Sequence, residues 1–77
     1  MTSDPHPNPA PRRRIWVLVK AARTLECEIK EHVKGHEVRV YLGGELYYRR
    51  FDVAWAEAEA QAAALKRMLL ADGWTHR

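Results

Sequence analysis

The sequence predicts an α+β fold in which a four-stranded antiparallel meander sheet carries one C-terminal helix across one face, in the order ββββα. Three observations predict it. Residues 15–51 contain four runs that either alternate apolar and polar residues or form a short apolar block. Short turns rich in glycine or alanine separate these runs. Residues 53–72 then consist almost entirely of strong helix formers.

Residues 1–14 differ in composition from the rest of the chain. In PHPNPAP a proline occupies every second position from Pro5 to Pro11, and Arg12, Arg13 and Arg14 follow. Each proline removes an amide donor and disfavours helix at the residue before it. We therefore predict a disordered Pro/Arg-rich tail over residues 1–14 and one ββββα domain over residues 15–77. The tail is either a solubilising leader or a polyproline ligand for a partner.

Four strands are expected after the tail. The first, IWVLVK, is apolar on both sides, whereas the second and third, TLECEIK and HEVRVYL, alternate apolar and polar residues. The fourth is ELYYRRF. Two-residue turns at Ala21-Ala22, Lys34-Gly35 and Gly43-Gly44 connect them. The last turn is the clearest, because two glycines accept the positive φ that type I′ turns require.

The helix is predicted from Asp52 onward. The Asp52 carboxylate can accept hydrogen bonds from the free amides of a first helical turn. The residues at helical spacing along the buried stripe are Ala54, Ala58, Ala62, Leu65 and Leu69. Gly73 stands where a left-handed residue ends a helix, and Trp74 follows where a Schellman motif places an apolar contact.

The turns fix which residues share a face of the sheet, because side chains alternate with a period of two. They pair Trp16 with Cys27, Ile29 with Val40, and Val40 with Tyr47. The side that faces the helix then holds Trp16, Leu18, Leu25, Cys27, Ile29, Val38, Val40, Leu42, Tyr47 and Phe51. Arg49 falls on the same side and is the one misfit.

A single helix leaves the other face of the sheet open. The apolar and aromatic residues expected there form the predicted interaction surface: Ile15, Val17, Val19, Tyr41, Leu46 and Tyr48. An exposed apolar patch on a small protein tends to mark an interaction site. We therefore predict a small non-catalytic binding module, a homo-oligomer such as a homodimer or the partner of another protein. It would associate through this face or through the edge of its first strand.

Nucleic-acid binding is the alternative function. Arg39 and Arg50 are expected beside two tyrosines on the open face, and Arg12, Arg13 and Arg14 add a basic arm. Aromatic and basic side chains together often hold single-stranded nucleic acid. Three glutamates on the same face, Glu26, Glu28 and Glu37, would repel phosphate. The net charge of +3 also lies mostly in the tail, because residues 15–77 are nearly neutral.

No constellation of catalytic or metal-binding residues stands out, so we expect neither an enzyme nor a cofactor or metal. His32 and His36 flank a turn and are predicted to point to opposite faces, whereas zinc requires three or four converging ligands. Cys27 alternates with Leu25 and Ile29, which indicates a buried thiol. It is the only cysteine of the 77 residues, so no internal disulfide can form, and we predict a reduced thiol in a cytoplasmic protein. No apolar run approaches the roughly 20 residues of a membrane span.

The pattern of residues 15–74 resembles a group of short bacterial proteins of unassigned activity. The shared positions are the strand tryptophan Trp16, Cys27 in the second strand, the hairpin Gly44-Glu45-Leu46, the segment Arg50-Phe51-Asp52 before an alanine-rich helix, and the closing Gly73-Trp74. These are turn, cap and core positions. The resemblance therefore implies the fold and assigns no functional site.

Overall fold

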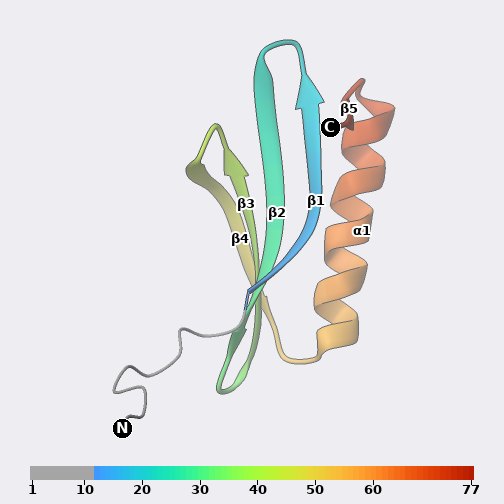
Figure 1. Ribbon diagram of the computed structural model, residues 1–77. Coiled ribbons are helices and arrows are strands. Elements are labelled where there is room, and N and C mark those ends of the chain that lie inside the picture. The colour runs from blue at the N-terminus through green and yellow to red at the C-terminus, as the bar shows by residue number, and fades with distance from the viewer. Residues whose placement is uncertain (1–11) are drawn as a thin grey trace, which may run out of the picture.

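The structure, a computed structural model, describes residues 12–77 and consists of one antiparallel sheet with one helix packed on it (Figure 1). The elements in chain order are β1 Arg12–Lys20, β2 Arg23–His32, β3 Gly35–Leu42, β4 Glu45–Asp52, α1 Trp55–Ala71 and β5 Thr75–His76. The sheet order is β4-β3-β2-β1-β5, so the first four strands form the expected meander. The predicted α+β arrangement of a meander sheet and a C-terminal helix is confirmed.

A fifth strand corrects the predicted number of strands. β5 pairs with β1, with His76 opposite Leu18 and Thr75 opposite Val19. The chain reaches β1 because Gly73, at φ 100°, reverses its direction at the end of α1. Two residues are too few to show an alternating pattern, so the sequence alone gave no signal for this strand.

The first strand begins at Arg12, three residues before the predicted domain boundary. Arg12, Arg13 and Arg14 pair with Lys30, Ile29 and Glu28 of β2. β2 is ten residues long, and its far end provides the backbone partners for this extension. The arginines therefore belong to the sheet and not to a tail. The rest of the predicted tail lies outside the described residues.

The second hairpin turn lies one residue earlier than predicted. His32 pairs with Gly35, so the turn residues are Val33 and Lys34, and Ile29 pairs with Val38 instead of Val40. A shift of two in the pairing keeps every side chain on its predicted face. Gly35 is needed inside the strand, because a Cβ there would lie 2.6 Å from Cζ of Phe51.

A β-bulge in β4 overturns the predicted faces of that strand. Tyr41 pairs with Leu46 but Val40 pairs with Tyr48, so Tyr47 is an extra residue. A one-residue insertion moves every later side chain to the opposite side of the sheet. The predicted pairing of Val40 with Tyr47 is therefore wrong. From Tyr48 onward the predicted helix-facing and open-facing residues exchange places, which moves Arg49 onto the open face.

A second bulge lies in β1, between Arg14 and Trp16. It leaves Ile15 as the extra residue. Ile15 packs against the core and lines a hollow with Ala60 and Ala63 of α1. Ile15 thus lies toward the helix, contrary to the prediction, while Trp16 and Leu18 are buried as expected.

The core lies between the sheet and α1. Its buried apolar residues are Trp16, Leu18, Leu25, Cys27, Ile29, Val38, Val40, Ala58, Ala62 and Trp74. Cys27 is confirmed as a buried thiol, and burial, with a smaller contribution from Glu28, raises its pKa to about 12. Tyr47 and Phe51 were predicted in this core but are 69% and 51% exposed. The bulge accounts for Phe51, which it turns away from the helix.

The two ends of α1 are stabilised differently. The helix begins at Trp55, so Asp52 does not cap it as predicted; Asp52 ends β4, where its Oδ1 accepts a hydrogen bond of 3.3 Å from Arg50. At the other end the Trp74 and Gly73 amides donate to the Leu69 and Leu70 carbonyls at 3.0 and 3.2 Å. This is the predicted Schellman motif, and Trp74 folds back into the core.

Candidate binding face

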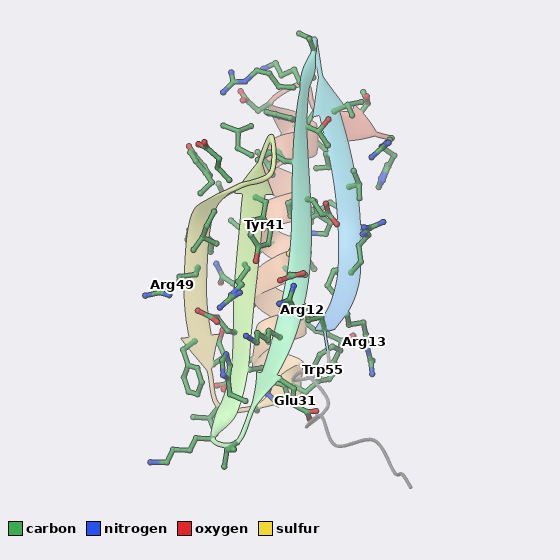
Figure 2. The ribbon with its side chains drawn as sticks, turned by 60° about the vertical axis from the view of Figure 1, so that its left-hand side comes forward. Arg12, Arg13, Glu31, Tyr41, Arg49 and Trp55 are labelled. Carbon is green, nitrogen blue, oxygen red and sulfur yellow. The ribbon has the colours of Figure 1, made fainter. Side chains whose placement is uncertain are left out.

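One face of the sheet has no layer over it in residues 12–77. Figure 2 looks onto this open face: α1 lies behind the strands, Tyr41 projects in front of them, and Arg49 extends from the edge strand β4. The strand register arranges the side chains of this face in rows that cross all four meander strands. The composition of the rows decides what the face can contact.

Two neighbouring rows carry most of the charge, and we call them the basic rows. One row is Arg12, Lys30, Glu37 and Phe51, and the other is Arg14, Glu28, Arg39 and Arg49. Together they hold five basic side chains and two carboxylates, an excess of three positive charges. The adjoining row, Val17, Glu26, Tyr41 and Leu46, is mainly apolar. The open face is therefore divided into a basic half and an apolar half.

Glu37 is the centre of a hydrogen-bonded network in the basic rows. Its carboxylate accepts from Arg39 Nε at 2.8 Å, lies 3.0 Å from His32 Nε2 and lies 3.7 Å from Arg49 Nη1. Burial alone would raise the pKa of Glu37, but the hydrogen bonds from His32 and Arg39 outweigh it and hold this pKa below that of an ordinary glutamate. Three potential cations thus share one carboxylate, so the positive charge around Glu37 is only partly neutralised.

The network continues across the face through Tyr41. The Tyr41 hydroxyl donates to Glu28 at 2.9 Å and accepts from Arg39 at 3.3 Å. The hydrogen bond from Arg39 to Tyr41 raises the pKa of Arg39; burial opposes this, and the hydrogen bond to Glu37 adds to it, so that the pKa is raised overall. In the β1 half, Arg14 forms a 2.6 Å ion pair with Glu26. Arg14 and Arg39 are consequently held in place.

An open hollow of about 750 Å³ lies at the end of the basic rows nearest the β2–β3 turn. Phe51 and the cationic side chains of Lys34 and Arg49 line it together with Glu37. The Phe51 ring lies over Gly35, whose missing Cβ makes room for it. The hollow therefore combines an aromatic surface with positive charge.

The structure divides the predicted interaction surface. Val17, Val19, Tyr41 and Leu46 lie on the open face, as predicted from alternation. Ile15 and Tyr48 do not. Ile15 is the extra residue of the β1 bulge, and the β4 bulge turns Tyr48 toward the helix, where its hydroxyl accepts a 2.9 Å hydrogen bond from Gln61 of α1. The remaining patch is less exposed than expected. Val17 and Val19 are half-buried in the sheet surface, and of the predicted set on this face only Leu46 is classed as exposed.

The predicted nucleic-acid contacts are divided as well. Arg12, Arg14 and Arg39 lie on the open face. Arg50 lies toward the helix, where it contacts Asp52 and donates to Gln61 at 3.0 Å. Arg13 also lies on the helix side, with its guanidinium 4.7 Å from the ring centre of Trp55.

Arg49, like Phe51, is a functional candidate that sequence reasoning missed. The bulge places it on the open face, opposite Arg39. The signal that could have found it was its misfit among apolar residues of the predicted core. A charged residue at a core position indicates that the register assumed for that strand is shifted.

The two edges of the sheet differ in exposure. β5 pairs with only two residues of β1, so it covers part of that edge. β4 forms the opposite edge over its whole length, and it carries three of the large exposed apolar side chains, Leu46, Tyr47 and Phe51. Of the two edges, β4 therefore carries the large exposed apolar side chains, whereas the predicted edge contact was along the first strand.

A smaller cluster surrounds the start of α1 on the helix side of the sheet. Arg13, Glu31 and Trp55 lie together there (Figure 2), around a hollow of about 270 Å³ that His36 also lines. The His36 ring meets Trp55 edge-on, with 5.5 Å between the ring centres.

Within residues 12–77 no three His, Cys, Asp or Glu side chains are placed to hold a metal ion. In the same part of the chain no helix is both long and apolar enough to cross a membrane.

Over residues 12–77 these features define a two-layer α+β arrangement with one uncovered, partly basic sheet face. No protein family, curated protein or solved structure matches the chain. The resemblance to short bacterial proteins accordingly stays a prediction.

Proposed function

We propose that this protein is a non-catalytic module that binds nucleic acid through the basic rows of its open sheet face. The observation that carries the proposal is the gathering of Arg12, Arg14, Lys30, Arg39 and Arg49 on one uncovered face. The sequence alone had distributed these residues between a tail, the core side and the open face. Two bulges and a longer first strand bring them together.

The charge of the basic rows matches a phosphate backbone. Phosphate contacts by lysine and arginine release condensed counterions, which supplies most of the affinity of non-specific binding. Arg12 has no carboxylate partner among residues 12–77, and Arg49 is 3.7 Å from a carboxylate that Arg39 already occupies. Both side chains can turn toward a phosphate without breaking a short ion pair.

The aromatic residues support nucleic acid over other anions. Tyr41 adjoins the basic rows and Phe51 ends one of them. Sheet faces that bind nucleic acid present aromatic rings for the bases next to basic side chains for the phosphates. An acidic protein could pair with the charges, but it has no bases to stack on the exposed rings.

The test is the salt dependence of oligonucleotide binding by the full-length chain, measured by fluorescence anisotropy. For a single strand the slope of log affinity against log salt is about −0.7 per phosphate contact. We expect the R12A/R49A variant to bind more weakly and the magnitude of its slope to decrease by about 1.4, which corresponds to two lost phosphate contacts. The matched control is K66A/R67A, which removes two basic residues from α1 on the other side of the sheet. Equal binding by the two variants, or no binding by the wild type at 50 mM salt, would overturn the proposal.

Self-association remains a second candidate, and the unpaired edge of β4 with its exposed Leu46 and Tyr47 is the observation that favours it. The same edge carries a bulge and two arginines, Arg49 and Arg50, which are the usual devices that prevent edge pairing. Light scattering on the full-length chain decides the matter. A dimer whose mass falls on L46K substitution would support the edge, and a monomer at 100 µM would exclude it.

A further inference from the structure

We infer that the nucleic acid is held as a single strand, with one unpaired base stacked on the ring of Phe51. This inference rests on the proposed function and names the form of its ligand. It is carried by the way in which the structure holds Phe51 at the end of the basic rows.

The ring of Phe51 is fixed on one side and accessible on the other. A Cβ at Gly35 would lie 2.6 Å from Cζ and 3.0 Å from Cε2 of Phe51, so the ring packs directly on the Gly35 backbone. The imidazole of His32 lies 6.2 Å away from the ring, tilted by 53°. Despite these contacts Phe51 is 51% exposed. A large apolar ring is thus presented to solvent in a set orientation, as a stacking surface requires.

Positive charge surrounds this ring. Arg49 is two residues earlier on the same strand and face, and Lys34 lines the same hollow of about 750 Å³. The one carboxylate in the hollow, Glu37, is already bonded by Arg39 and close to His32. A base on the ring would therefore have its flanking phosphates beside two cations.

This arrangement selects for an unpaired base. In a duplex both faces of each base are covered by its neighbours, so a ring on a sheet surface cannot reach them without unstacking. Bases of a single strand can turn out and stack on an aromatic side chain. The stacking does not depend on base identity, because every base has a π-face. We expect binding with little sequence preference.

The chain offers a matched pair of variants for the test. Phe51→Leu removes the ring from the open face. Tyr47→Leu removes a ring of the same strand that is even more exposed, at 69% against 51%, and that lies on the helix side near Leu42 and Trp74. The probes are a fluorescein-labelled 15-mer of thymidylate and a labelled 15-base-pair duplex at one salt concentration. Loss of one stacked base corresponds to a weakening of roughly fivefold to a hundredfold. We expect F51L to weaken single-strand binding by at least about fivefold and duplex binding by less than twofold, with Y47L unchanged for both.

A ring-retaining variant guards against a loss of folding. Phe51→Tyr keeps the stacking surface, so it should keep the single-strand affinity of the wild type, and thermal unfolding checks that F51L is folded. If F51L and Y47L lower single-strand affinity equally, or F51L weakens duplex binding as much, the stacking inference fails while nucleic-acid binding stands. If the wild type binds neither probe, the proposed function itself fails.

Discussion

The indole N–H of Trp16, in the middle of β1, donates a 2.9 Å hydrogen bond to the main-chain carbonyl of Ala62, in the middle of α1. Both residues are buried, at 5% and 0% exposure. A carbonyl in a helix interior already serves the helix's own hydrogen-bond ladder, so the indole uses its second lone pair. The small side chain of Ala62 allows the helix to approach the strand closely enough for this hydrogen bond. The bond in turn fixes the position of the helix along the strand.

Replacing Trp16 by Phe should destabilise the fold by about 2 kcal/mol. The change removes one buried hydrogen bond, worth about 1 kcal/mol, and leaves a small cavity. Urea unfolding followed by circular dichroism gives the difference. The matched control is Trp55→Phe, because Trp55 is only partly buried and its main partner is the Arg13 guanidinium. A smaller loss for Trp16→Phe than for this control would mean that the indole bond contributes nothing.

Deleting Tyr47 should be tolerated. The residue is the extra one of the β4 bulge, so its removal joins Leu46 to Tyr48 in a regular ladder and keeps every other side chain on its present face. We expect a folded protein, destabilised by no more than about 2 kcal/mol, with unchanged far-ultraviolet circular dichroism. Without a bulge in the native strand, the same deletion would turn Tyr48 through Asp52 to the wrong faces. An unfolded deletion variant would therefore contradict the observed register.

Two substitutions at positive φ should act in opposite directions. Gly73 has φ 100° at the end of α1, and Gly73→Ala should lower the free energy of unfolding by about 1 kcal/mol, because a Cβ disfavours this conformation. Ala21 has φ 54° in the first hairpin turn. Ala21→Gly relieves the same strain and should be neutral or stabilising by up to about 1 kcal/mol. Thermal unfolding of both variants checks the signs, and a stabilising Gly73→Ala would contradict the Schellman geometry.

The stability of the protein should depend on pH through Glu37. The folded state lowers the pKa of this carboxylate, so its ionised form is favoured by folding. Its contribution is fully present above the pKa of an unfolded glutamate, about 4.3, and is lost as the pH falls through the lower folded value. The difference in unfolding free energy between wild type and Glu37→Gln should therefore shrink as the pH falls from 6 to 2. Urea titrations at several pH values measure it, and a difference that stays constant with pH would contradict the assignment.

The sequence by itself determined the four meander strands, the helix and most of the core. The alternation in residues 24–30 and 37–42 requires strands buried on one side, and the alanine-rich run requires a helix, since these periodicities are local properties. Gly43 and Gly44, at φ 58° and 89°, form the expected hairpin turn. Gly73 and Trp74 likewise form the expected helix end. A positive φ depends on a single residue, so it can be predicted from the local sequence.

The tertiary structure decided the register, and with it the candidate site. A bulge depends on how a strand fits both its neighbour and the helix behind it: Tyr48 reaches Gln61, and Arg50 reaches Asp52 and Gln61, only after Tyr47 is looped out. One such residue reverses a whole strand, which is why Arg49 and Phe51 came to the open face. The extension of β1 to Arg12 likewise depends on the length of β2. These are relations between segments far apart in the chain, and no local pattern encodes them.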